Sequence, residues 1–196
     1  MFNLNHTGFH LVGLNMTATS VPMMRPRYYD QVQLRFWIAL LTLLTVSQGR
    51  AGVFEDGDVL MLQAAPGAIH FNSDPEHAKY SWLVGLEWQS ASHWLVGASY
   101  FNNSFNQKCE YFYFGKSWPL DFISDNEIFK SLYFKLTGGL LLGYKEPYED
   151  KIPFNNDGVA PGVVPALGYQ YGDFNVQLNL LGGAGVMFTF GYNFLK

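Results

Sequence analysis

The chain has 196 residues and a formal net charge of −4, and only 14% of its residues are charged while 17% are aromatic. This length fits one domain, the charge content is low for a surface in water, and a negative charge without a basic stripe argues against a nucleic-acid partner. The single cysteine, Cys109, excludes an internal disulfide and a cysteine metal cluster. The sequence indicates no metal site and no soluble cofactor.

The first quarter of the chain carries the pattern of a secretory signal. The apolar run FWIALLTLLTV at residues 36–46 is preceded by arginines and followed by small residues. A run this short cannot span the ~30 Å of hydrocarbon in a bilayer, which disfavours an uncleaved anchor. We therefore expect a leader and signal peptide in residues 1–51, with Met23 or Met24 as an alternative start of translation, and a mature domain in residues 52–196.

Downstream of residue 58, apolar and polar residues alternate with the period of two that is typical of β-strands. In residues 82–89, for example, Trp82, Val84 and Trp88 share one face, and Glu87 and Gln89 lie on the other. The expected strands cover about residues 59–71, interrupted by Pro66, then 82–89, 94–101, 109–118, 132–144, 163–171, 174–181 and 186–194.

These strands predict a membrane barrel. One strand face carries Trp, Phe, Leu and Val, whereas the other carries Glu, Gln, Asn, Lys and Gly; a soluble lipocalin-like barrel would place its apolar stripe inward instead. An even number of strands returns both ends of the chain to one side. We expect an all-β fold, namely an eight-stranded antiparallel transmembrane β-barrel with periplasmic termini, in the outer membrane of a Gram-negative cell.

The residues expected to point inward differ between the two ends of the barrel. Those toward the outer end are apolar (Leu83, Phe101, Leu141, Val164, Leu181 and Met187). Those toward the periplasmic end are polar (Glu87, Gln89, Lys135, Gln170, Asn175, Gln177 and Asn193), with Leu95 as an exception. This pattern suggests a hydrocarbon-sized well that opens near the outer leaflet and is closed below by polar groups. Ordinary filling by side chains is the alternative, because an eight-stranded barrel is barely wide enough for them.

In this topology, residues that could act in catalysis lie together at the outer rim. His70 ends the first expected strand, and Asn103 and Ser104 lie in the loop after the third. Histidine is the side chain most easily tuned as a general base near neutral pH, and a nearby hydroxyl can be activated or can support an oxyanion. A structural role for both residues is the alternative.

At these residues the chain resembles the lipid A palmitoyltransferase family of outer-membrane enzymes. The resemblance rests on Ala68-Ile69-His70-Phe71 and on Tyr100-Phe101-Asn102-Asn103-Ser104-Phe105-Asn106, and it continues weakly through residues 115–118, 136–139 and 165–169. It covers about residues 60–194.

The resemblance implies an enzyme that moves a palmitoyl chain from a phospholipid donor in the outer leaflet to a lipid A acceptor. The catalytic His and Ser of the family map to His70 and Ser104, and its catalytic Asp maps to Asn103. This last position is a departure, since Asn can orient an imidazole but cannot stabilise the imidazolium as a carboxylate does.

The family also admits lipid sideways where prolines interrupt strand pairing, which makes Pro66 and Pro161 or Pro165 candidates for lateral access. Gly115, if it points inward, would form the floor of the well and set the acyl length. The expected substrate-binding residues are Leu83, Phe101, Gly115, Leu141, Leu181 and Met187. We expect a monomer. The rival interpretations are a non-catalytic barrel that binds lipid or has a structural role in the envelope, which Asn103 favours, and a small-solute channel.

Overall fold

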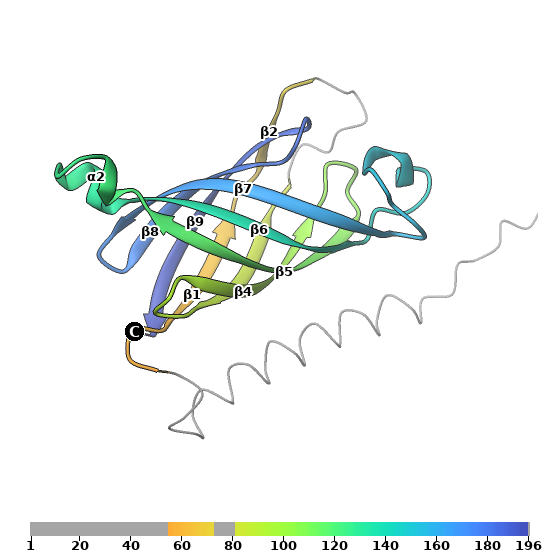
Figure 1. Cartoon of the computed structure of the whole chain (residues 1–196). Helices are drawn as coiled ribbons and strands as arrows, with labels where there is room; N and C mark the ends of the chain where they lie inside the picture. The colour runs from red at the N-terminus through yellow and green to blue at the C-terminus, as the bar shows by residue number, and fades with distance from the viewer. Residues whose placement is uncertain (1–54, 73–80, 196) are drawn as a thin grey trace, which may run out of the picture. The chain divides into compact units, whose positions relative to one another are not determined.

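The computed structural model describes residues 55–72 and 81–195, which form an all-β barrel (Figure 1). The expected leader and signal peptide, residues 1–51, lies outside the described residues. The strands are β1 (Val59–Ala65), β2 (Ala68–His70), β3 (Leu83–Gln89), β4 (Trp94–Asn102), β5 (Lys108–Pro119), β6 (Leu132–Leu142), β7 (Val159–Tyr171), β8 (Phe174–Leu180) and β9 (Gly185–Leu195). Short helical turns lie between them: η1 (Asp121–Ile123), α2 (Glu127–Ser131) and η2 (Glu149–Lys151). None of the helices in this part of the chain has the length and apolar character needed to cross a membrane.

The sheet closes on itself through its first and last strands. Every ladder is antiparallel, in the order β1-β3-β4-β5-β6-β7-β8-β9-β2, and β1 also pairs with β9. β1 and β2 are successive parts of one barrel strand, interrupted at Pro66, because proline offers no N–H to a ladder. The expected eight-stranded antiparallel barrel is therefore confirmed. We call the end where Leu60 pairs with Leu195 the lower end, and the end where β2 and β4 finish the upper end.

Two strand boundaries differ by more than one residue from the sequence expectation. β7 starts at Val159 rather than at residue 163, so that Pro161 as well as Pro165 lies inside it, paired with β6. The ladder between β7 and β8 begins only at Ala166, so the upper part of β7 pairs with one described strand, β6, and tolerates proline. β6 ends at Leu142 rather than at residue 144, because Gly143 turns the chain with a φ of +115°.

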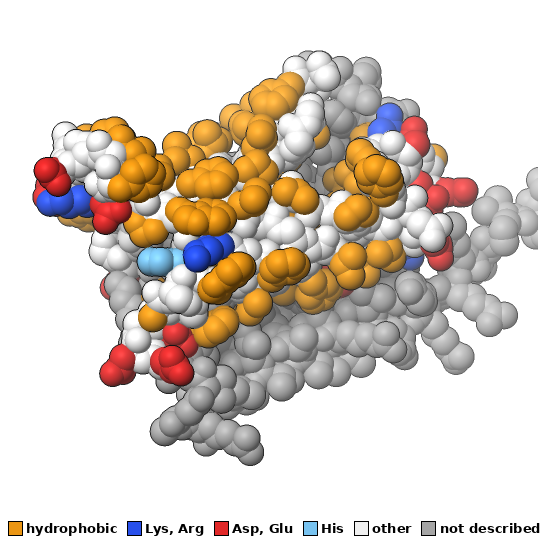
Figure 2. Space-filling model, in the orientation of Figure 1, with side chains coloured by type: hydrophobic (Ala, Val, Ile, Leu, Met, Phe, Trp, Pro, Cys, Tyr) orange, Lys and Arg blue, Asp and Glu red, His pale blue; other side chains and the backbone are white. Residues whose placement is uncertain are grey.

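The two faces of the wall differ in the way that the alternation predicts. Along β8 every second residue is buried, namely Asn175, Gln177 and Asn179, while the apolar residues between them point outward. Apolar side chains cover the visible outer wall of the barrel (Figure 2). The exposed apolar residues of the wall include Val84, Trp94, Val96, Phe114, Leu140, Val163, Leu167, Val176, Phe188 and Phe190.

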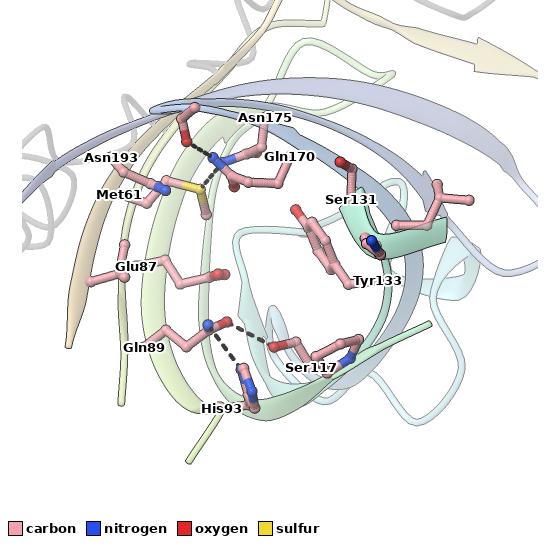
Figure 3. A pocket seen from close by; sticks show the side chains of 15 residues that line it. Met61, Glu87, Gln89, His93, Ser117, Ser131, Tyr133, Gln170, Asn175 and Asn193 are labelled. Atoms are coloured by element: carbon pink, nitrogen blue, oxygen red, sulfur yellow. Dashed lines mark hydrogen bonds between the residues drawn. The ribbon is translucent and has the colours of Figure 1, made fainter. Parts of the chain in front are cut away.

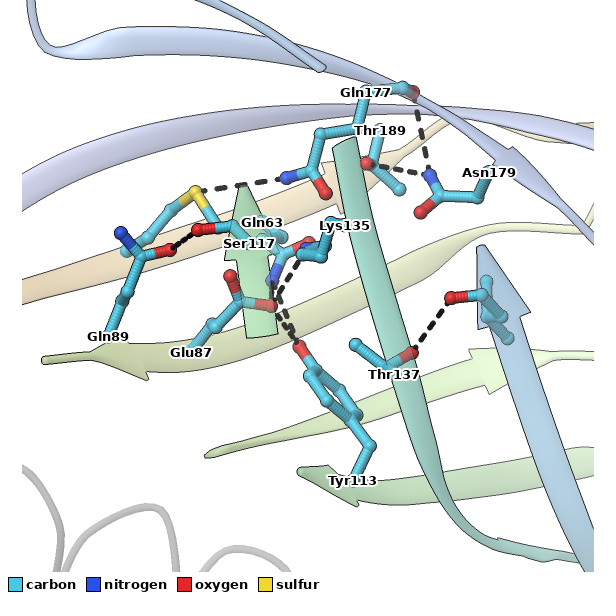
Figure 4. A network of polar contacts seen from close by, with 12 residues as sticks. Gln63, Glu87, Gln89, Tyr113, Ser117, Lys135, Thr137, Gln177, Asn179 and Thr189 are labelled. Carbon is cyan, nitrogen blue, oxygen red and sulfur yellow. Dashed lines mark hydrogen bonds and ion pairs between the residues drawn. The ribbon is translucent and has the colours of Figure 1, made fainter. Parts of the chain in front are cut away.

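A polar network crosses the interior (Figure 4). The Lys135 ammonium lies 2.9 Å from Oε2 of Glu87, which also accepts hydrogen bonds from the Tyr113 hydroxyl at 2.9 Å and from Gln63 Nε2 at 3.2 Å. All four side chains are buried. Both charges are paired, and the carboxylate also accepts hydrogen bonds, so their burial is compensated. Since the four residues come from β1, β3, β5 and β6, the network links these strands across the barrel.

An aromatic and apolar cluster adjoins this network. Leu95, Tyr111 and Tyr113 form a buried cluster, and the rings of the two tyrosines stack with centroids 5.0 Å apart. Phe101, near the end of β4, and Leu141, near the end of β6, pack against this cluster. These side chains occupy part of the narrow interior that an eight-stranded barrel provides.

Candidate functional site

His70 and Ser104 meet at the upper end of the barrel. Nε2 of His70 is hydrogen-bonded to Oγ of Ser104, across 34 positions of sequence. If Nε2 carries no proton, the serine hydroxyl donates to it, which is the arrangement that activates a hydroxyl as a nucleophile. The expectation that the end of the first strand and the loop after the third expected strand lie at one level is confirmed, and the two side chains are in direct contact.

The position of His70 is fixed by the backbone of β2. His70 pairs with Gly185 of β9, and the N–H of the following residue, Phe71, donates to the carbonyl of Ala184 at 3.0 Å. At the start of β2, the N–H of Ala68 donates to Oγ of Ser81 at 3.1 Å. These contacts hold both ends of the short strand, so the imidazole projects from a defined backbone.

Ser104 lies in a turn that Asn103 shapes from within. Oδ1 of the buried Asn103 accepts the backbone N–H groups of Phe105 at 2.9 Å and Gln107 at 2.8 Å, and its Nδ2 donates to Oε1 of Gln107 at 3.2 Å. This is the local hydrogen bonding by which an asparagine replaces backbone partners in a turn. None of the hydrogen bonds that Asn103 makes in the described part of the chain reaches His70, so its influence on the imidazole would pass through Ser104.

A second loop, residues 143–158, is fastened to the turn that carries Ser104. Nε2 of Gln107 donates to the carbonyl of Lys145 at 2.9 Å, and the rings of Phe105 and Tyr148 stack with centroids 4.1 Å apart. In the same loop, burial raises the pKa of the Tyr144 phenol above its ordinary value, with the neighbouring Cys109 as a second cause. The phenol therefore stays neutral, and the two loops form one packed cap beside the pair of His70 and Ser104.

The residues expected to line an acyl well occupy the upper interior, except Gly115, which lies lower and pairs with Leu95. Phe101 and Leu141 share the cluster of Leu95, Tyr111 and Tyr113, Met187 is buried on β9, and Leu83 and Leu181 are half-buried. Gly115 does point inward and is buried; a Cβ there would lie 2.2 Å from the carbonyl oxygen of Leu136. Sequence reasoning missed Tyr111 and Tyr113, although they share the strand parity of Gly115. The role of these residues in binding an acyl chain stays a prediction.

The prolines lie at two interruptions of the wall. Pro66 separates β1 from β2, and Pro161 and Pro165 lie on the part of β7 that has no ladder with β8. A stretch of strand with one neighbour leaves backbone groups without strand partners, which weakens the wall there. Lateral access for lipid at these places stays a prediction.

A cavity of about 340 Å³ lies at the lower end, away from the pair of His70 and Ser104 (Figure 3). Its lining includes the polar side chains of Glu87, Gln89, Ser117, Tyr133 and Asn193. Sequence reasoning placed those of β3 and β9 in the polar lower half of the interior but looked for a binding site at the other end. The described residues hold no cluster of three or more His, Cys, Asp or Glu side chains that could bind a metal ion.

Comparison with known proteins gives no further guide to the site, since no protein-family model and no curated protein matches this chain.

Proposed function

We propose that the protein is an outer-membrane acyltransferase that moves a palmitoyl-type chain from a phospholipid donor to lipid A. The observation that carries the proposal is the hydrogen bond between Nε2 of His70 and Oγ of Ser104, because a base in contact with a hydroxyl is the minimum that acyl transfer requires. The resemblance around residues 68–71 and 100–106 supplies the substrate class.

The chemistry balances with these two residues alone. Oγ of Ser104 attacks the ester carbonyl of the donor while Nε2 of His70 takes its proton; the ester C–O bond breaks, and the lysophospholipid oxygen leaves with that proton. The lipid A hydroxyl then gives its proton to Nε2 and attacks the acyl-serine, which restores the Ser104 hydroxyl. Alternatively, His70 takes the proton of the acceptor hydroxyl, which attacks the donor ester carbonyl directly while the Ser104 hydroxyl donates to the developing oxyanion. The donor ester C–O bond then breaks, and the lysophospholipid oxygen leaves with the proton held by His70.

The outer wall supports placement in a membrane. Phe114, Val163 and Ile69 are among many large apolar side chains that are more than half exposed on the described surface. An apolar band of this extent would be a liability in water, whereas an outer-membrane barrel presents such a band to lipid. Lys116, near the lower end, lies with its ammonium 5.0 Å from the centre of the Trp94 ring, and interfacial aromatic residues of this kind are typical of membrane barrels.

The decisive experiment is mass spectrometry of lipid A from Gram-negative cells that express the wild-type chain, His70→Ala or Ser104→Ala. We expect a palmitate-sized mass gain with the wild type and none with His70→Ala. For Ser104→Ala, complete loss indicates the acyl-serine route, and a residual of about one part in 10²–10³ indicates a role as oxyanion donor. Ser92→Ala is the matched control, because this exposed hydroxyl, in the lower turn after β3, is hydrogen-bonded among the described residues to Ser90 alone.

Correct insertion of each variant is checked by the change of electrophoretic mobility on heating that folded barrels show. Identical lipid A from wild type, variants and empty vector, with the barrel inserted, would overturn the proposal. In that case the non-catalytic lipid-binding or structural barrel becomes the better interpretation, consistent with an asparagine at position 103.

A further inference from the structure

The cavity at the lower end is separate from the proposed acyl-transfer site. It lies beyond the polar network of Glu87, Lys135, Tyr113 and Gln63, whereas His70 and Ser104 lie at the upper end. Its volume of about 340 Å³ falls within the ~300–1,000 Å³ that is typical of small-molecule sites. The cavity has therefore the size of a binding site and no part in the chemistry proposed above.

Three polar groups of the lining have hydrogen-bonding capacity left over. All hydrogen bonds to the Glu87 carboxylate from described residues end on Oε2, so Oε1 of this side chain, only 2% exposed, is an open acceptor in the lining. The Tyr133 hydroxyl and the Asn193 side-chain amide make no hydrogen bond with any described residue. Figure 3 shows Glu87 and Tyr133 pointing into the cavity from opposite sides.

The position of Tyr133 is enforced by the wall itself. Its ring lies over Gly168 on β7, where a Cβ would be 2.1 Å from Cζ of the ring. Any side chain at position 168 would collide with the Tyr133 ring. Because residue 168 is glycine, the ring lies flat against β7 with its hydroxyl in the cavity. The Tyr133 hydroxyl is thus held in the cavity by the shape of the wall and can hydrogen-bond to a ligand.

The charges around the cavity are already compensated. The Glu87 carboxylate has the Lys135 ammonium at 2.9 Å, and Lys130 at the rim is paired with Glu127 at 2.7 Å. A charged ligand would have to compete with these pairs or stay unpaired in a partly buried site, at a high cost in desolvation. The cavity therefore favours a neutral ligand.

The remaining lining offers both donors and acceptors beside apolar surface. Ser117 Oγ donates to Oε1 of Gln89 at 2.9 Å, and Asn175 and Gln170 add further amides, while Val59 and Met61 supply apolar edges. Amides and hydroxyls that can donate and accept match a ligand with several hydroxyl groups, whose C–H faces suit the apolar edges. We infer that this cavity binds a small neutral hydroxylated molecule, of the class of a hexose or a linear polyol.

The test uses the full chain folded in a phosphocholine detergent, because detergents with sugar headgroups would compete for the cavity. D-glucose and D-sorbitol are titrated by saturation-transfer NMR, with glucuronate and glucosamine as charged counterparts. We expect saturable millimolar binding of at least one neutral probe and weaker binding of both charged ones. Tyr133→Phe, which removes a hydroxyl without a described partner, should weaken binding roughly fivefold.

Tyr171→Phe is the matched control, since Tyr171 points outward at the same end and is 76% exposed. If Tyr133→Phe does not fold, Asn193→Ala takes its place with the same expected loss. The inference is overturned if neither neutral probe saturates, which would mean that the cavity holds only water, or if a charged probe binds more tightly. Equal affinity in the wild type and in the folded cavity variant would overturn it as well.

Discussion

Gly185 faces His70 across the ladder between β2 and β9, and the backbones approach too closely there for any side chain. A Cβ on Gly185 would lie 2.1 Å from the carbonyl oxygen of Ile69 and 2.9 Å from Cα of His70. Both contacts are with backbone, which cannot move aside without moving β2. The position of the proposed base therefore depends on a residue that has no functional group.

We predict that Gly185→Ala displaces β2 from β9 and so separates Nε2 of His70 from Oγ of Ser104. Misplacement of a catalytic group by about 1 Å can cost roughly 10²-fold in rate. Acylation of lipid A should fall by about that factor while the barrel remains inserted. Gly183→Ala is the control, because a Cβ at this position of the same turn meets nothing within 4 Å. Equal activity of the two variants would contradict the prediction.

Asn103 should act through the turn that it shapes. Asn103→Ala deprives the backbone N–H groups of Phe105 and Gln107 of their acceptor, and an unmet buried donor costs about 1–3 kcal/mol. We expect a lower free energy of unfolding in urea and a loss of lipid A acylation. Asn103→Asp keeps the acceptor oxygen and should retain most of the stability. The prediction fails if Asn103→Ala unfolds at the wild-type urea concentration.

The proposed acyl well can be tested by filling it. Leu141 packs inward against the tyrosine cluster, whereas its neighbour Leu140 points outward and is 55% exposed. We expect Leu141→Trp to shorten the acyl chain that is transferred, or to abolish transfer, because the larger side chain takes up interior volume. Mass spectra of lipid A report the chain length directly. Leu140→Trp should leave the chain length unchanged, and a wild-type spectrum for Leu141→Trp would argue against the well.

The buried ion pair between Lys135 and Glu87 should contribute to stability in a way that depends on both partners being present. Lys135→Met leaves the Glu87 carboxylate buried without its counter-charge, and breaking such a pair from one side costs about 3–5 kcal/mol. The double variant Glu87→Gln/Lys135→Met should recover most of this loss. Urea unfolding followed by tryptophan fluorescence measures both values. Lys116→Met on the outer wall is the control; a loss there as large as for Lys135→Met would refute the explanation.

Much of this fold could be predicted because alternation in a barrel has a fixed meaning. Period two separated the buried Glu87 and Lys135 from the exposed Trp94 and Val96, and chain direction then put His70 and Ser104 at one end. The tyrosine cluster could not be foreseen in the same way, because β5 has aromatic residues on both faces and pattern alone does not reveal which rings fill the interior. The start of β7 was wrong: the strand begins at Val159 rather than at residue 163, and it accommodates Pro161 where it has no ladder with β8.

Two other features lay beyond sequence reasoning for a geometric reason. The closeness of Gly185 to β2 depends on the register between the first and last strands, which joins positions more than a hundred residues apart. The lower cavity depends on how far each inward side chain reaches across the barrel, and this follows from rotamers rather than from residue type.

Among the described strands, β2 has a ladder with β9 alone, and β9 is the last strand. The ladder that holds His70 is therefore complete only after the final strand has joined the first, a step with a large loop-closure entropy. For the acyltransferase proposed above, a chain stalled during insertion would lack the ladder that positions His70 and would not efficiently cleave the phospholipids around it. Acyl transfer would then begin only when the barrel is complete. The strand order would thus protect the membrane from an incompletely assembled protein.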